Sequence, residues 1–144
     1  MLKSLSVVAL LLMVAGIFGL YYSHALFSYA PLVIAVQAIA VALMIWARIT
    51  FGLRSFHATA NPTEGRLVTN GPYRLVRHPI YTAICLFTIA GASAHISIMS
   101  ATFVLLTLSG SIIRILAEEH LLIKQYPEYQ DYAKRVKRML PLIF

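Results

Sequence analysis

The chain has 144 residues, 60% of them hydrophobic, with a mean hydropathy of +0.79 and a formal net charge of +7. This length fits one domain, and the apolar composition excludes an ordinary soluble fold and favours a membrane protein. The basic residues flank apolar segments instead of forming one soluble patch. We therefore interpret them as topology signals and contacts with membrane lipids, and we expect no nucleic-acid partner.

Four apolar segments follow one another along the chain, at residues 5–22, 31–49, 79–94 and 96–117. A helix of about 20 apolar residues crosses the hydrocarbon core of a bilayer. The sequence therefore predicts an all-α, polytopic membrane helix bundle with four transmembrane helices. Because only a short turn separates the third and fourth segments, we expect these two helices to form a tight hairpin.

The lysines and arginines all lie on one side of this arrangement. The connection at residues 22–30 and the turn at 91–97 contain none, whereas basic residues cluster between positions 48 and 77 and from position 114 onward. The positive-inside rule then predicts that both termini are cytoplasmic in a multi-pass integral membrane protein. We favour a bacterial plasma membrane over the endoplasmic reticulum. The first apolar segment is long for a signal peptide, so we expect it to be retained as an anchor.

The segment from Gly71 to Tyr81 is a basic loop that runs directly into the third span. His78 precedes the helix-opening Pro79, at an N-cap position where free backbone N–H groups and the helix dipole attract negative groups. Tyr73 and Tyr81 have the size and polarity to pack on an aromatic base or a thioether chain. The same residues are also typical of an interfacial aromatic belt with snorkelling arginines, and the spacing leaves both interpretations open.

Two charged residues close the fourth span, where Arg114 and Glu118 lie four positions apart and share one helix face. An isolated ion pair of this kind is weak, but ionisable groups near the bilayer boundary usually face a cavity or a partner. The planar fork of an arginine suits a carboxylate, and Glu118 suits an ammonium group or hydroxyls. We expect the adjacent Glu119 to point elsewhere around the helix and to be solvated.

The tail carries a stripe of tyrosines at every third position, at Tyr126, Tyr129 and Tyr132, which Val136 and Met139 extend. This pattern predicts a C-terminal amphipathic cytosolic helix with aromatic groups on one face and cations on the other. Such a helix lies by default on an anionic membrane surface, and capping a cofactor pocket is the alternative. The chain has one cysteine and no metal-binding or phosphate-loop motif, so we expect no metal site.

The order of four motifs resembles that of the isoprenylcysteine carboxyl methyltransferase family over roughly residues 65–144. These motifs are Gly-x-Tyr-x-x-x-Arg-His-Pro-x-Tyr, a Glu-Glu pair, Tyr-x-x-Tyr and Leu-Pro. The members are integral membrane enzymes that use S-adenosyl-L-methionine, with phospholipid methyltransferases as relatives. The resemblance implies this cofactor and a lipid or prenylated acceptor, and we infer no obligate protein partner. We expect one domain over residues 1–144, with two N-terminal spans (1–50) followed by a cofactor-binding core (51–144).

The resemblance also implies roles for individual residues. Arg114 matches the arginine assigned to the carboxylate of the substrate, and we take it as the catalytic and substrate-binding candidate. The candidate cofactor-binding residues are Gly65, Arg66, Leu67, Val68, Tyr73, His78, Pro79, Ile80, Tyr81 and Glu118.

The implied reaction is an in-line displacement in which the acceptor attacks the methyl carbon of a sulfonium. A prenylcysteine-type carboxylate is the favoured acceptor and needs no general base, because it is already ionised at neutral pH. A phospholipid amine or a thiol is the alternative and needs a base, for which Glu118, Glu119 or His78 are candidates. A sterol reductase-like protein that binds NADPH shares the His-Pro-x-Tyr block, although the acidic pair argues against it. A non-catalytic membrane scaffold is the further alternative.

Overall fold

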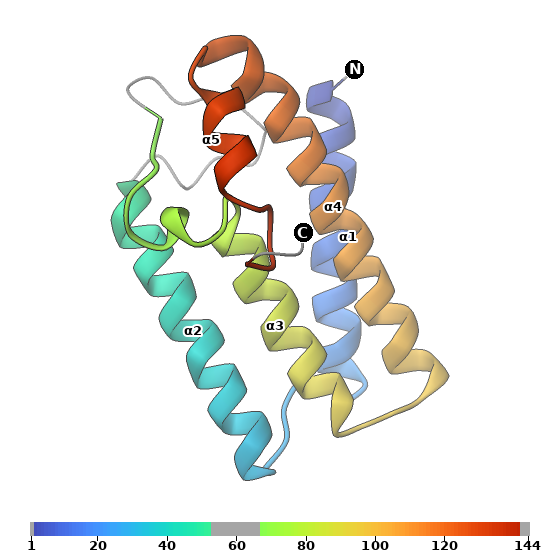
Figure 1. Cartoon of the computed structure of the whole chain (residues 1–144). Coiled ribbons are helices and arrows are strands. Elements are labelled where there is room, and N and C mark those ends of the chain that lie inside the picture. The colour runs from blue at the N-terminus through green and yellow to red at the C-terminus, as the bar shows by residue number, and fades with distance from the viewer. Residues whose placement is uncertain (1, 53–66, 142–144) are drawn as a thin grey trace.

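The computed structural model of the protein describes residues 2–52 and 67–141. Within these ranges the helices are α1 (Leu2–Tyr22), α2 (Pro31–Phe51), the 3-10 helix η2 (Gly71–Arg74), α3 (Pro79–Ser93), α4 (Ile98–Gln125) and α5 (Tyr129–Arg135). The described ranges contain no β-strand beyond an isolated parallel bridge between Val76 and Lys137. The four longer helices lie side by side as a bundle, and the short α5 lies near the C-terminal end of α4 (Figure 1). The all-α prediction is confirmed.

The bundle is built from two helix pairs, because α4 packs along α1 and α3 packs along α2. Glycines allow the first pair to approach closely. A Cβ atom on Gly110 would lie 2.5 Å from the carbonyl oxygen of Ala9, and one on Gly16 would lie 2.6 Å from that of Phe103. The predicted tight hairpin of the third and fourth spans is therefore not confirmed. Only residues 94–97 connect α3 to α4, yet each helix packs more extensively on an N-terminal neighbour.

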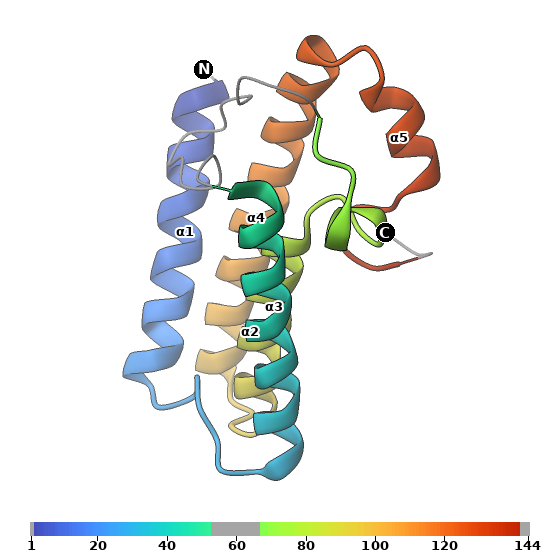
Figure 2. The same ribbon diagram turned by 90° about the vertical axis from the view of Figure 1, so that its left-hand side faces the viewer.

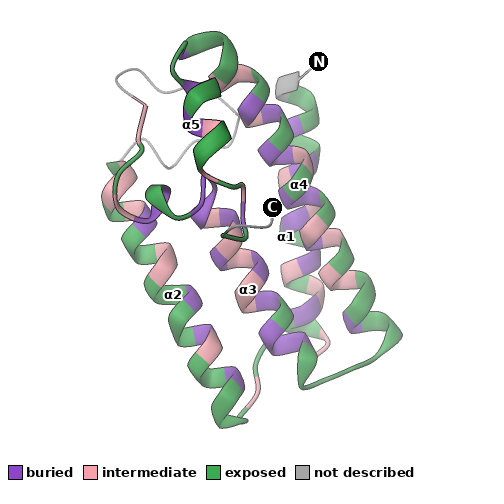
Figure 3. Ribbon diagram, viewed as in Figure 1, coloured by how far each residue is buried: buried purple, intermediate pink, exposed green. Residues whose placement is uncertain are grey.

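Three of the described helices, α1, α2 and α4, are long and apolar enough to cross a membrane. Within the apolar windows of these helices, only 22% to 33% of residues are buried inside the protein, and the outward faces are exposed (Figure 3). The helix α3 has 15 residues and spans about 22 Å, which is less than the roughly 30 Å of a hydrocarbon core. The third predicted span, at residues 79–94, is therefore not confirmed, and the α3 helix that forms there is instead the most enclosed of the apolar helices.

The C-terminal segment packs on the protein and is helical for seven residues only. Tyr126, Tyr129 and Tyr132, called here the tyrosine cluster, are buried together against the rest of the molecule. After α5 the backbone becomes extended and runs beside the residues that precede α3, as Figures 1 and 2 show at the same end of the bundle. The predicted amphipathic helix is thus wrong beyond Arg135. The physical reason is that the backbone N–H groups of Arg77 and His78 bind carbonyl groups of this extended segment.

Candidate functional site

The first turn of α3 sets the position of the histidine. His78 is the N-cap residue and Pro79 opens the helix, as predicted, and both are buried. The imidazole makes no capping hydrogen bond and points to the foot of α4 instead. Its Nδ1 lies 3.7 Å from Oε2 of Glu118, and its Nε2 lies 3.3 Å from Oε1 of Glu119. The basic loop and the acidic pair, 40 positions apart in the chain, therefore meet at one imidazole.

A hydrogen-bonded chain of three side chains lies next to this imidazole. Tyr81 donates its hydroxyl proton to Oε1 of Glu118 and accepts a hydrogen bond of 2.8 Å from Nε of Arg114. Nη2 of Arg114 lies 3.5 Å from the same Glu118 oxygen, which confirms that these two residues share a helix face. Nη1 of Arg114 donates to the carbonyl oxygen of Ser6 at 3.3 Å, so α1 also contributes to the site.

Glu118 is the open member of this group. Its side chain is 25% exposed, whereas the side chains of Arg114 and His78 are 6% and 5% exposed. Because the buried groups around it are fixed by packing and hydrogen bonds, an incoming polar ligand would reach the carboxylate of Glu118 first. This carboxylate can accept hydrogen bonds from an ammonium group or from hydroxyls.

Tyr73 lies on η2, near enough to Glu118 to be affected by its negative charge. It is buried, and its ring packs on Phe51 with the ring centres 5.6 Å apart. Burial, with a smaller contribution from the negative charge of Glu118, raises the pKa of the Tyr73 hydroxyl well above its usual value. This shift favours the neutral hydroxyl, which can donate a hydrogen bond to a ligand.

Glu119 is the residue that sequence reasoning placed wrongly. It is not solvated but 6% exposed, and its carboxylate is bound by Arg77, His78 and Arg138. Adjacent helix positions differ by about 100° around the axis, yet the carboxylates of Glu118 and Glu119 both reach the imidazole of His78. The prediction failed because the side of α4 that carries Glu119 is covered by the entrance to α3 and by the C-terminal segment, which supply the residues that bind this carboxylate. The adjacent basic residues Arg77 and His78 were the one feature of the sequence that could have indicated a partner for Glu119.

The remaining predicted cofactor residues lie around this cluster or outside the described residues. Leu67 packs against the tyrosine cluster, which places the start of the described loop beside α5. Val68 and Ile80 are half-buried. Gly65 and Arg66 lie outside the described residues.

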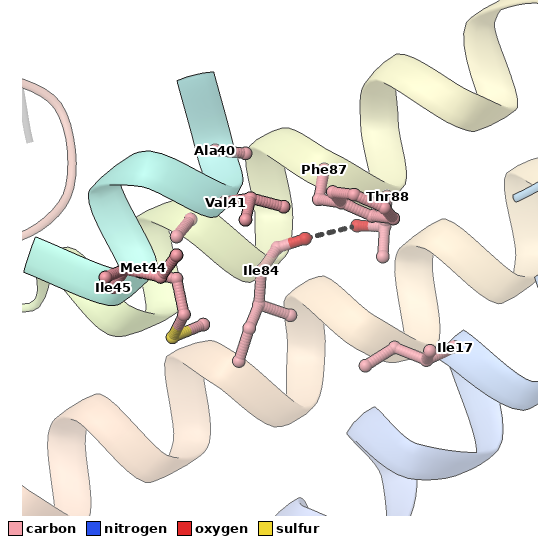
Figure 4. Close-up of a pocket in the computed structure, with 9 residues that line it drawn as sticks. Ile17, Ala40, Val41, Met44, Ile45, Ile84, Phe87 and Thr88 are labelled. Carbon is pink, nitrogen blue, oxygen red and sulfur yellow. Dashed lines mark hydrogen bonds between the residues drawn. The ribbon is translucent and has the colours of Figure 1, made fainter. Parts of the chain in front are cut away.

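An apolar pocket of about 180 Å³ lies between α1, α2 and α3 (Figure 4). Its walls include Ile17, Val41, Met44, Ile84, Phe87 and Thr88. The hydroxyl of Thr88 donates to the carbonyl oxygen of Ile84 at 2.9 Å, so the one hydroxyl among the described lining residues is already hydrogen-bonded. Ile84 follows Tyr81 by one turn of α3, a rise of about 4.5 Å. The apolar pocket thus begins close to the charged cluster.

The described residues contain no group of three or more His, Cys, Asp or Glu side chains that could hold a metal ion. What the arrangement offers is a partly exposed carboxylate, a buried guanidinium and buried tyrosines, one of which, Tyr81, lies one turn of α3 before a residue of the apolar pocket. Such a site suits a ligand that carries a positive group and an acceptor that carries both a negative group and a hydrocarbon chain.

Comparison with known proteins gives one family and two curated relatives. The family model described as "Isoprenylcysteine carboxyl methyltransferase (ICMT) family" matches residues 29–124, about two thirds of the chain. The chain is 38% identical over 82 residues to the nickel-cobalt-cadmium resistance protein NccN of Alcaligenes xylosoxydans xylosoxydans, covering 52% of this chain and 36% of that protein. It is 36% identical over 80 residues to the cobalt-zinc-cadmium resistance protein CzcN of Cupriavidus metallidurans, covering 52% and 35%. The chain thus matches about a third of the length of these relatives, and no solved structure matches it.

Proposed function

Because the chain belongs to the isoprenylcysteine carboxyl methyltransferase family of membrane methyltransferases, we propose that it transfers a methyl group from S-adenosyl-L-methionine to a lipid-like acceptor in the membrane. The favoured acceptor is the carboxylate of a prenylcysteine-type molecule. The observation that supports this proposal best is that a charged, hydrogen-bonded group of side chains lies near an apolar pocket. Tyr81, which is hydrogen-bonded to both Arg114 and Glu118, lies one turn of α3 before Ile84, a residue that lines an apolar pocket.

The cofactor would be held mainly by Glu118. Its partly exposed carboxylate suits the ammonium group of S-adenosyl-L-methionine, and the neutral, buried Tyr73 and Tyr81 offer ring faces and hydroxyls beside it. When bound, this cofactor supplies an electrophilic methyl group on a positively charged sulfur. The predicted contacts from Leu67, Val68, Pro79 and Ile80 to the cofactor belong to the same proposal, as do those from Gly65 and Arg66 outside the described residues.

The acceptor carboxylate would be held by Arg114. The guanidinium is buried, oriented by the Tyr81 hydroxyl and by the carbonyl oxygen of Ser6, and aligned over the ring of Tyr81 at 6.0 Å. A carboxylate is ionised at neutral pH, so Arg114 needs to orient it and no residue has to remove a proton. Holding the two reactants in line is worth roughly 7–11 kcal/mol in well-oriented reactions, which makes positioning the main contribution of these residues.

The hydrocarbon part of the acceptor would lie in the apolar pocket between α1, α2 and α3. At about 180 Å³ the pocket is smaller than a typical site for a whole drug-sized ligand, and it suits a segment of a chain. We place the site at the cytoplasmic end of a four-helix bundle in which α3 also lies in the membrane and both termini are cytoplasmic. A bacterial plasma membrane and a single domain over residues 1–144 complete this proposal.

A second acceptor class has one observation in its favour. Nδ1 of His78 lies 3.7 Å from Oε2 of Glu118 while Nε2 faces Glu119, an arrangement in which the second carboxylate orients the ring. An imidazole held this way would serve as the base that a phospholipid amine or a thiol requires. The names of the two relatives concern resistance to metals, and the proposal draws its chemistry from the family instead.

The test is transfer of a labelled methyl group from S-adenosyl-L-methionine into a native membrane lipid extract by the purified protein in detergent. We expect label in a lipid fraction that is released as methanol by mild base, because a methyl ester is base-labile. Label that resists base would indicate an amine or thiol acceptor. Binding of adenosylhomocysteine without any transfer would support a scaffold, and binding of NADPH in its place would support a reductase-like protein.

A further inference from the structure

The last described part of the chain, residues 126–141, is called here the C-terminal strap, and it lies against the residues that carry the candidate site. The backbone N–H of Arg77 donates to the carbonyl oxygen of Lys137 at 2.7 Å, and that of His78 donates to Arg138 at 2.9 Å. One turn further on, the hydroxyl of Thr82 donates to the carbonyl oxygen of Met139 at 3.0 Å. The strap therefore binds two backbone N–H groups just before α3 and one side chain in the first turn of α3.

One buried carboxylate joins the strap to the helices. Oε1 of Glu119 accepts hydrogen bonds from Nε and Nη2 of Arg77 at 3.0 and 2.6 Å, while Oε2 accepts one from Nε of Arg138 at 2.9 Å. Nη1 of Arg77 donates to the carbonyl oxygens of Ala133 and Val136 at 2.8 and 2.6 Å. Arg77 and Glu119 thus form a continuous connection from α4, through the start of α3, to the strap.

The same carboxylate also contacts the site itself. Oε1 of Glu119 lies 3.3 Å from Nε2 of His78, whose other ring nitrogen faces Glu118. Met139 of the strap packs in the same apolar cluster as Tyr81 and Ile115. The strap and the carboxylate therefore support the back of the group of residues that the proposed reaction uses.

We propose that Glu119 is a positioning residue, which clamps the C-terminal strap and thereby fixes His78 and Tyr81 in the geometry that binds the cofactor. This inference rests on the proposed function, and it assigns a role to a residue and a segment that the reaction does not touch. The negative charge is essential to the role, because two guanidinium groups and an imidazole surround this carboxylate. A glutamine would present an amide N–H₂ group to at least one of these donors, so one contact would become repulsive.

The experiment compares the full chain with its Glu119→Gln and Glu119→Asp variants in detergent, using Asp131→Asn as the control. Asp131 also pairs with a lysine, but that ion pair is fully at the surface, with both side chains 74% exposed. Amide hydrogen exchange at Arg77 and His78 measures strap docking directly, since both amides bind strap carbonyl groups. Calorimetry with adenosylhomocysteine measures the cofactor site without requiring turnover.

We expect Glu119→Gln to speed exchange at these two amides and to weaken adenosylhomocysteine binding, each about tenfold, while exchange in α1 and α2 stays at the native level. Glu119→Asp should recover part of both effects, and Asp131→Asn should change neither. Faster exchange with unchanged binding would overturn the inference, and so would unchanged exchange. If Glu119→Gln does not fold, Arg138→Gln serves in its place, since its side chain is 33% exposed, and the same criteria apply. A native chain that does not bind adenosylhomocysteine would refute the proposed function itself.

Discussion

Replacing Tyr81 by phenylalanine removes one oxygen atom from the centre of the site and leaves the buried ring in place. That oxygen donates to Glu118 and accepts from Arg114, so two hydrogen bonds to charged groups are lost. Such bonds contribute about 1.5–3 kcal/mol each. Glu118 is partly exposed and regains water, whereas Arg114 is buried and does not, so the net loss should be close to that of one bond. We therefore expect kcat/KM for methyl transfer to fall about 10–150-fold.

The assay is transfer of labelled methyl groups to the acceptor fraction at several acceptor concentrations, with Tyr22→Phe as the matched control. Tyr22 is 79% exposed at the end of α1 that lies far from the site, so the same chemical change there should leave kcat/KM at the native value (Figure 2). Native activity in Tyr81→Phe would refute the reasoning, because it would mean that the hydroxyl does not orient Arg114 and Glu118. An equal loss in the control variant would do so as well.

Three further predictions test other parts of the account. Arg114→Lys keeps a positive charge but loses the planar fork that binds a carboxylate. The affinity for adenosylhomocysteine should therefore stay within about twofold in calorimetry, while turnover falls at least tenfold. Equal losses of affinity and turnover would mean that Arg114 does not bind the acceptor carboxylate specifically. Val41→Trp should fill the apolar pocket from its rim and raise KM for the lipid acceptor. Ile34→Trp, on an exposed part of α2 outside the pocket, should leave KM unchanged. The same KM in both variants would show that the acceptor does not occupy the pocket. Gly110→Leu should destabilise the fold by about 1–3 kcal/mol in thermal unfolding, because the new Cβ meets the backbone of Ala9; an unchanged midpoint would contradict the close packing of α1 and α4.

Local spacing predicted the parts of the site that lie on single helices. Arg114 and Glu118 meet because four positions make slightly more than one helical turn, and His78 and Pro79 occupy the N-terminal positions that their chemistry favours. The meeting of Tyr81 with Glu118 followed less directly, from the expectation that the basic loop and the acidic pair lie on the same side of the membrane.

Contacts between residues far apart in the sequence could not be predicted from local spacing. The environment of Glu119 depends on where the chain returns after α5, and no periodicity in α4 encodes that return. The tail beyond Arg135 has a helical pattern, but its carbonyl groups bind the N–H groups of Arg77 and His78 instead of continuing the helix. The pairing of α3 with α2 likewise depends on packing surfaces that the short α3–α4 connection does not determine.

The central claim is that the entrance to α3 and the foot of α4 form one site for S-adenosyl-L-methionine. Its most direct test is a calorimetric titration of adenosylhomocysteine into the purified protein and its Glu118→Gln and Glu128→Gln variants. The account predicts binding to the native chain, a loss of at least about tenfold in affinity for Glu118→Gln, and native affinity for the exposed Glu128→Gln. Absence of binding to the native chain, or equal affinity in the Glu118 variant, would contradict it.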